Sequence, residues 1–156
     1  MTTLKQILDN TKDVTLSVPE TVSNIEFYYL ALGRDAEKEF PFVIHGLWPQ
    51  YSPGHWPQFC REQPFVLDRL KPLLPQLHAE WHNYRGPDEQ FWEYEWLKHG
   101  TCTGMSEIEY FTKVLELSYK TRDLDIDWIW KQFSDRTFNL PIDLDWNFKI
   151  PKNSPG

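Results

Sequence analysis

The chain has 156 residues, which is the length of one domain, and we expect residues 1–156 to share a single core. Its formal net charge of −7 argues against a protein that holds nucleic acid through a broad basic surface, because such binding needs Lys and Arg to neutralise phosphates. An enzyme with a locally positive cleft is still compatible with this charge. No run of about 18 apolar residues is present, so we expect no membrane-spanning helix.

The N-terminal part of the chain is polar and only weakly patterned. Residues 1–10 lack the apolar stretch of a secretory signal, so either the chain is intracellular or a signal has been removed. Both alternatives stay open. The pattern predicts a short helix over Leu4–Leu8 and a strand over Val14–Val18 that stops at Pro19.

Two β-strands are predicted next. The stretch Ile25–Leu32 is β-branched and aromatic enough for a central strand, and a turn is expected to begin at Gly33. The second strand covers Phe42–Leu47 and is expected to end at Trp48 and Pro49.

His45 lies within the second predicted strand. A period of two places it on one face with Val43 and Leu47, whereas Gly46 lies on the other face. A lone histidine in an apolar strand is more often a hydrogen-bonded core residue than a functional one. The acid–base groups found further along the chain reverse that preference, and Gly46 would allow a ligand to approach closely.

The stretch from Phe65 to Trp81 is predicted to form one or two short helices, because Pro72 and Pro75 interrupt its apolar stripe. His78 and His82 at its end have a spacing compatible with zinc. The order of residues is not that of a metalloprotease helix, so we interpret both as solvated histidines on a helix face. A metal-dependent hydrolase using His78, Glu80 and His82 is the less favoured alternative.

The most unusual stretch is Phe91–Cys102, which we expect to contain the working centre. On a helix capped by Asp88 and ended by Gly100, Glu95 would share one face with Lys98 and His99. An ordinary amphipathic helix is the alternative, but burying charged groups among aromatic rings needs a reason. Two histidines, one acid and one lysine are sufficient for acid–base chemistry on a phosphate ester.

The last third of the chain has a structural pattern. Ser106 is the predicted N-cap of a helix, with Glu107 and Glu109 in its first turn. Its predicted buried stripe is formed by Ile108, Phe111, Val114, Leu115 and Tyr119. The tail through Pro141 and Trp146 is predicted to be irregular or to form a final strand.

Cys60 and Cys102 permit one pairing. A bridge between them would close a loop of about forty residues and stabilise the fold by roughly 4 kcal/mol. Two free buried thiols are the alternative, which an intracellular location would favour.

The segments His45–Pro49 and Glu95–Cys102 resemble the two active-site segments of the ribonuclease T2 family, in the same order and at a suitable separation. The resemblance extends from about Phe27 to Tyr119. It implies an α+β fold with a central antiparallel sheet flanked by helices. It also implies endonucleolytic cleavage of single-stranded RNA to a 2′,3′-cyclic phosphate without metal or cofactor.

The resemblance also implies a role for each site residue. His45 would be the general acid on the leaving 5′-oxygen and His99 the general base on the 2′-hydroxyl. Glu95 and Lys98 would stabilise the charged transition state. Trp48 resembles the family's base-stacking residue, and Tyr51 is a second candidate for stacking. Cys60 and Cys102 resemble the family's central disulfide.

The sequence departs from the family pattern at two positions in the site. Tyr94 stands where many members carry a third histidine, so a hydroxyl would contact the phosphate there. Gln50 stands where an acidic residue is frequent, so we expect little base specificity. The chain is also short and poor in cysteine for the family.

The expected partner is RNA, with no binding to DNA or membrane, and we expect a monomer. The family suggests a secreted, periplasmic or lysosomal type of compartment. A catalytically weak RNA-binding or signalling member of the same fold is the alternative function. Because both histidines are present in this chain, the enzyme is the favoured interpretation.

Overall fold

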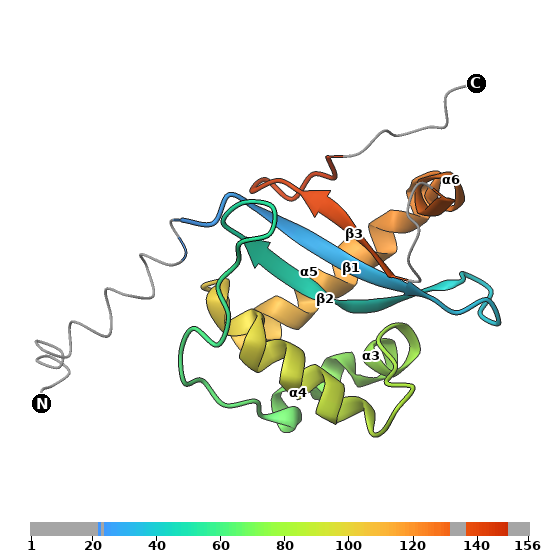
Figure 1. Ribbon diagram of the computed structural model, residues 1–156. Coiled ribbons are helices and arrows are strands. Elements are labelled where there is room, and N and C mark those ends of the chain that lie inside the picture. The colour runs from blue at the N-terminus through green and yellow to red at the C-terminus, as the bar shows by residue number, and fades with distance from the viewer. Residues whose placement is uncertain (1–21, 23, 132–136, 150–156) are drawn as a thin grey trace, which may run out of the picture.

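A computed structural model describes residue 22, residues 24–131 and residues 137–149. The helix predicted over Leu4–Leu8 and the strand predicted over Val14–Val18 lie outside these residues. Three antiparallel strands form the sheet in the order β2-β1-β3 (Figure 1). They are β1 (Phe27–Arg34), β2 (Phe42–Gln50) and β3 (Thr137–Ile142). The prediction that the strand over Ile25–Leu32 is central is confirmed. Of the two alternatives for the tail, the final strand is present as β3.

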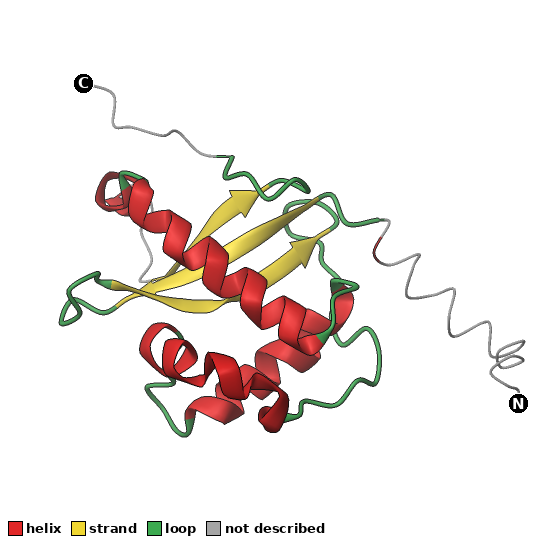
Figure 2. Ribbon diagram, turned by 180° about the vertical axis from the view of Figure 1, so that it is seen from behind, coloured by secondary structure: helices red, strands yellow, loops and turns green. Residues whose placement is uncertain are grey.

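Helices pack on one face and along one edge of this sheet, which confirms the α+β class. Figure 2 shows α5 crossing one face, and Figure 1 shows α3 and α4 beyond the β2 edge. The helices are η1 (Leu67–Leu73), α3 (Leu74–Glu80), α4 (Asp88–Lys98), η2 (Gly100–Cys102), α5 (Glu107–Lys120), η3 (Thr121–Asp123) and α6 (Ile126–Lys131). The short helices predicted before Trp81 are therefore present. Within the described part of the chain, no helix is long and apolar enough to cross a membrane.

The β2 strand differs from its prediction in length and in facing. It continues through Trp48 and Pro49 to Gln50, because an edge strand tolerates the missing N–H of proline. Its register with β1 slips between the residues that face Ile44 and Gly46, so His45 is the extra residue of a β-bulge. The predicted alternation of faces is wrong for this reason.

The bulge keeps the core intact while it changes the direction of His45. Ile44 and Leu47 are both fully buried, although a regular strand would place them on opposite faces. On β1, Leu30 and Leu32 lie opposite these two residues and are buried as well. The face that α5 covers is therefore continuous across the bulge.

The ends of α4 are shifted by one residue from their predicted positions. Pro87 is the N-cap and Asp88 is the first helical residue, so the predicted capping by Asp88 is wrong. His99 is the C-cap, and Gly100 continues in the 3-10 helix η2 instead of stopping the chain in a left-handed conformation. A Cβ at Gly100 would overlap the ring of Trp96, so the glycine serves close packing.

The α5 helix begins as predicted, with a capping box between Ser106 and Glu109. The predicted buried stripe is only partly right, because Ile108 and Tyr119 are exposed. Tyr110 and Leu117 are buried in their place. The reason is that α5 packs against the sheet on one side and against α3 on the other, which rotates and widens its buried face.

Candidate active site

The C-terminal half of α4 carries polar groups on its buried side. Trp92, Glu95, Trp96 and His99 recur at the spacing of one helix face, and all four are buried. Acidic residues in the first turn and Lys98 in the last suit the helix dipole. The sequence therefore builds a stable helix whose apolar stripe is interrupted by one carboxyl group and ends in one imidazole.

Glu95, Lys98 and His99 line one pocket of about 400 Å³, which confirms that they lie on a common face. The opposite wall comes from the sheet face that α5 leaves uncovered, and the loop after β2 closes one end. The full lining is Tyr29, Trp48, Gln50, Gly54, Trp56, Glu95, Lys98, His99 and Asn139. The two sequence segments thus meet in space.

Glu95 is held by the indole of Trp48, whose Nε1 donates a hydrogen bond to Oε1 at 2.8 Å. Burial raises the pKa of Glu95 from its ordinary value of 4.5 to about 7. The bond from Trp48 and the charge of Lys98 act in the opposite direction, and burial outweighs them. Glu95 therefore holds its proton in mildly acidic solution.

His99 stacks on the ring of Trp48, with ring centroids 5.1 Å apart and planes 24° from parallel. Burial, assisted by the charge of Lys98, lowers the pKa of His99 to about 3. Its Nε2 is 3.9 Å from Glu95 Oε1, which is too long for a hydrogen bond. The imidazole is neutral over most of the pH range, so the two groups do not form an ion pair.

Lys98 supplies the positive charge of the pocket. Its Nζ lies 5.5 Å from the ring centroid of Tyr94, a cation–π distance. Tyr94 is half exposed, and its ring edge also meets Phe59. Tyr94 is therefore placed where it steadies the lysine.

His45 lies near this pocket but does not line it. Its ring meets the edge of Phe91, one helical turn before Glu95. A Cβ built on Gly33 would fall 2.5 Å from His45 Nε2, so the imidazole lies over Gly33. Gly33 shares a strand face with Tyr29, which lines the pocket, so His45 occupies a farther point of the same face. Burial lowers the pKa of His45.

The other two predicted binding residues lie on either side of the strand end. Gln50 lines the pocket, is buried, and its Nε2 donates to the carbonyl of Trp48 at 3.4 Å. Tyr51 lies in a neighbouring hollow with Trp56. Trp56 lines both hollows, so they are adjacent.

Four residues of the lining were not predicted: Tyr29, Gly54, Trp56 and Asn139. Tyr29 enters the lining because it pairs directly with Trp48, and the register between β1 and β2 decides that pairing. The exposure of Trp56 depends on the path of the loop after β2. Asn139 comes from β3, whose pairing next to β1 is a long-range event that local sequence does not encode.

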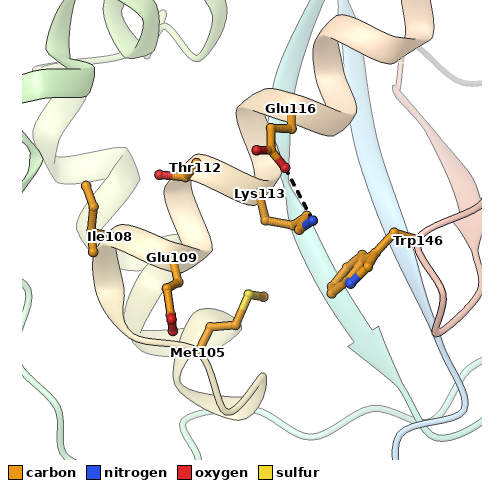
Figure 3. Close-up of a pocket in the computed structure, with 7 residues that line it drawn as sticks. All are labelled: Met105, Ile108, Glu109, Thr112, Lys113, Glu116 and Trp146. Carbon is orange, nitrogen blue, oxygen red and sulfur yellow. Dashed lines mark ion pairs between the residues drawn. The ribbon is translucent and has the colours of Figure 1, made fainter.

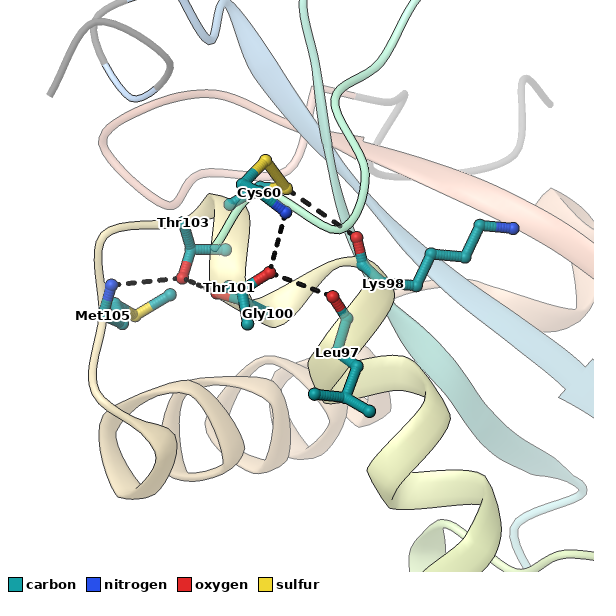
Figure 4. Close-up of a disulfide and its surroundings, with 8 residues drawn as sticks. Cys60, Leu97, Lys98, Gly100, Thr101, Thr103 and Met105 are labelled. Atoms are coloured by element: carbon teal, nitrogen blue, oxygen red, sulfur yellow. Dashed lines mark hydrogen bonds between the residues drawn. A yellow bond between two sulfur atoms is a disulfide. The ribbon is translucent and has the colours of Figure 1, made fainter. Parts of the chain in front are cut away.

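The disulfide between Cys60 and Cys102 is present, which confirms the predicted pairing (Figure 4). It ties the loop after β2 to η2. Hydrogen bonds reinforce this link, from Phe59 N to the carbonyl of Lys98 and from Cys60 N to Thr101 Oγ1. The C-terminal end of α4 is thereby tied to the loop that supplies Gly54 and Trp56 to the pocket.

The residues proposed for a metal-dependent alternative do not converge. His78 and His82 each place Nδ1 on the carboxylate of Asp88, at 2.6 and 2.8 Å. Glu80 instead pairs with Arg122 and Lys38. The prediction of two helix-face histidines is wrong for His82, which lies beyond the end of α3.

A second hollow of about 460 Å³ lies between α5 and the chain after β3 (Figure 3). It contains the ion pair of Lys113 with Glu116, and the ring of Trp146 faces the same lysine at 4.9 Å. Met105 and Ile108 complete its apolar side. None of the predicted site residues lies there, and its lysine is already paired with Glu116.

On this α+β scaffold, a carboxyl group, an ammonium group and an imidazole line one pocket where an edge strand meets a helix end. The sequence model of the ribonuclease T2 family matches residues 17–132, and the chain belongs to this family. It is 38% identical over 84 residues to intracellular ribonuclease LX of Solanum lycopersicum, which covers 51% of this chain and 35% of that protein. It is 40% identical over 94 residues to ribonuclease T2 of Homo sapiens, covering 54% and 34%.

Solved structures show the same fold. Ribonuclease MC1 from bitter gourd seeds is 27% identical with a TM-score of 0.55, covering 62% of this chain and 58% of that one. An RNase-related protein from Calystegia sepium is 21% identical with a TM-score of 0.67, covering 84% and 94%. The chain spans only 35% to 39% of the length of three of the sequence relatives that it matches.

Proposed function

We propose that this chain is an endoribonuclease that cleaves single-stranded RNA by transphosphorylation, through a 2′,3′-cyclic phosphate. The observation that carries the proposal is the convergence of Glu95, Lys98 and His99 in one pocket, with a neutral imidazole and a protonated carboxyl group. The named relatives are ribonucleases, which supports the same reaction class. The reaction needs no cofactor, because the substrate supplies its own nucleophile.

In the proposed reaction His99 is the base. Its neutral imidazole takes the proton from the ribose 2′-hydroxyl, and O2′ attacks the adjacent phosphorus. The bond from phosphorus to the 5′-oxygen breaks, and His45 gives that oxygen a proton. One proton is taken and one is given, so the products are a 2′,3′-cyclic phosphate and a free 5′-hydroxyl.

Lys98 and Glu95 meet the charge that develops on the phosphorane oxygens. Lys98 supplies a full positive charge. A carboxyl group that keeps its proton to about pH 7 does not repel the phosphate, and can donate a hydrogen bond to it. Lys98→Ala should therefore lower kcat with little change in KM, since the interaction is made in the transition state.

The pKa values of His99 and His45 predict that the reaction is fastest in acidic solution. His99 must be neutral, which holds above a pKa of about 3. His45 must be protonated, and burial keeps its pKa below the ordinary histidine value, so activity falls as pH rises through that lowered pKa. Activity should therefore be highest in acidic solution and low at neutral pH.

The choice of RNA over DNA would be chemical, because only RNA has the 2′-hydroxyl. Trp48 and Tyr51 are the proposed stacking rings. Gln50, which lines the pocket, and Tyr94, which lies against Lys98, are the other proposed substrate-binding residues. A mutant of ribonuclease MC1 with 26% identity and a TM-score of 0.55 has been solved with 5′-UMP, which supports nucleotide binding by a protein of this fold. We propose a monomer with little base specificity.

The test is incubation of the protein with single-stranded RNA and with matched DNA at pH 5, in excess chelator. RNA fragments ending in 2′,3′-cyclic phosphate, with DNA intact, are expected. Loss of cleavage in chelator would contradict the metal-independent reaction. Binding of RNA without any cleavage would favour the RNA-binding or signalling alternative, and His99→Ala controls for contaminating nuclease.

A further inference from the structure

Trp48 contacts both groups that bear the unusual proton affinities. Its indole N–H donates to Glu95 Oε1 at 2.8 Å, and the same ring stacks on His99. Glu95 and His99 lie 3.9 Å apart without a hydrogen bond between them. The indole is therefore the group that both of them touch.

Gly46 leaves the space in which this arrangement fits. A Cβ at this position would overlap Glu95 Oε1 and would lie 2.6 Å from Trp48 Nε1. Gly46 and Trp48 are two residues apart on β2, so they share a strand face at the point where α4 approaches. The glycine thus admits the carboxyl group of the helix, and the tryptophan holds it.

His99 depends on the stack because it has few other restraints. Its Nδ1 is buried, and within the described residues no group hydrogen-bonds to it. A catalytic imidazole is commonly oriented by a hydrogen bond at its second nitrogen. For His99, the stacked ring of Trp48 and the packing around the helix end restrain the imidazole instead of such a hydrogen bond.

We propose that Trp48 is a positioning residue of the acid–base site, holding the Glu95 carboxyl group through its N–H and the His99 imidazole through its ring. This role is separate from stacking on a base and rests on the proposed ribonuclease reaction only for its effect on rate. The groups that face Glu95 are Lys98 and His99 from its own helix end, Trp48 from β2 and Tyr110 from α5. Among them, Trp48 alone donates a hydrogen bond to it within the described structure.

The experiment separates the two contacts by using two substitutions. Trp48→Phe keeps a ring on His99 and removes the N–H, whereas Trp48→Ala removes both. Glu95 is followed by carbon NMR of carboxyl-labelled glutamate, with Glu95→Gln to assign its resonance, and His99 by its imidazole resonances. Trp56→Phe is the matched control, because Trp56 lines the same pocket and makes no hydrogen bond to Glu95 in the described structure.

Trp48→Phe should raise the pKa of Glu95 by about one unit, the size expected for loss of one hydrogen bond to the ionised form. It should leave the pKa of His99 in place. Trp48→Ala should shift both groups, with His99 moving up towards the ordinary histidine value as water reaches it. Trp56→Phe should leave both titrations unchanged.

The kinetic arm distinguishes positioning from base stacking. On a dinucleotide, Trp48→Phe should lower kcat about tenfold and change KM less than twofold, matching loss of alignment and not of binding. A rise in KM alone, with Glu95 titrating as in the unsubstituted protein, would overturn the proposal and leave Trp48 as a stacking residue. If the unsubstituted protein cleaves no RNA, the proposed function fails while the NMR titrations still decide the contacts of Trp48.

Discussion

Each end of α4 has a buried carboxyl group next to histidine side chains, but the two ends differ in how these groups are bonded. At the N-terminal end, the carboxylate of Asp88 accepts a hydrogen bond from the imidazole of His78 and lies 2.8 Å from Nδ1 of His82. At the C-terminal end, Glu95 and His99 lie 3.9 Å apart and share no hydrogen bond. Both carboxyl groups are buried, so burial alone does not distinguish the two ends.

The number of partners distinguishes them. Burial would raise the pKa of Asp88, but the N–H of Asn83, the bond from His78 and the nearby imidazoles lower it overall. Glu95 has one bond from Trp48 and a distant cation, and burial prevails. The histidines that contact Asp88 are half exposed, whereas both Glu95 and His99 are buried. The carboxylate of Asp88, whose hydrogen bonds are made, stabilises the fold. Glu95 and His99, which have few hydrogen bonds, are the groups that we propose to take part in catalysis.

The largest expected effect is on catalysis and is confined to the C-terminal end. His99→Ala or His45→Ala should lower the rate on RNA by about 10² to 10⁴-fold, the usual contribution of a positioned acid or base. His78→Ala should leave the rate within about twofold, because that imidazole lies at the far end of the helix. Steady-state rates on RNA at pH 5 measure all three.

A substrate with an easily departing 5′-leaving group sharpens this result. Such a substrate needs no proton donor, so it should restore His45→Ala and leave His99→Ala slow. Restoration of His99→Ala instead would reverse the two roles. If neither variant is restored, the histidines hold the phosphate and do not transfer protons.

The second effect is on stability, and again it differs between the ends. Reducing the bridge of Cys60 and Cys102 opens a loop with a sequence separation of 42, which should lower the free energy of unfolding by roughly 4 kcal/mol. Denaturant unfolding with and without reductant measures this.

Hydrogen exchange after reduction tests where the disulfide acts. Protection of amides near His99 should fall before that of amides near Asp88, and an equal fall at both ends would contradict the local anchoring.

The third prediction concerns the dependence of stability on pH. Because the folded pKa of Glu95 is raised from 4.5 to about 7, its contribution is fully present below pH 4.5 and is lost as pH rises through 7. Glu95→Gln removes this loss, so the variant should match the unsubstituted protein at pH 4. At pH 8 it should be more stable by roughly 3 kcal/mol, converting the shift at 1.36 kcal/mol per unit.

His99 opposes this trend and must be accounted for in the measurement. Its pKa is lowered, so its contribution is present above pH 6.5 and is lost as pH falls towards 3. Urea unfolding of both proteins across pH 4 to 8 isolates the Glu95 effect, since His99 is common to both. No change in the difference between the two proteins would mean that Glu95 titrates normally.

Sequence predicted the parts of this site that depend on local spacing. The common face of Glu95, Lys98 and His99 follows from a helical repeat, and the cap at Ser106 follows from a four-residue pattern. The pairing of the two cysteines came from the family resemblance. In each case the information lies within a few residues or in a known motif.

The parts that were missed depend on long-range contacts. The bulge at His45 exists because β2 must keep Ile44 and Leu47 in the core, and the register with β1 decides that. Asn139 enters the pocket only because β3 pairs with β1. The bond between Trp48 and Glu95 joins residues 47 positions apart, which no local pattern specifies.

The smallest effect tests the N-terminal end by the same substitution, carboxyl to amide. Asp88→Asn should destabilise the protein by about 1 to 2 kcal/mol at pH 7, since hydrogen bonds to an ionised acceptor are lost. The folded pKa of Asp88 is lowered, so its contribution is present above about pH 4 and disappears as pH falls through that lowered value. The loss of unfolding free energy caused by Asp88→Asn should therefore vanish in strong acid. The kcat on RNA at pH 5 should stay unchanged. Urea unfolding at pH 8, pH 7 and pH 2 measures the loss beside Glu95→Gln, whose effect has the opposite sign at pH 8. If both substitutions were destabilising at pH 8, Glu95 would be a satisfied structural carboxylate like Asp88, and the distinction between the two ends of α4 would fail.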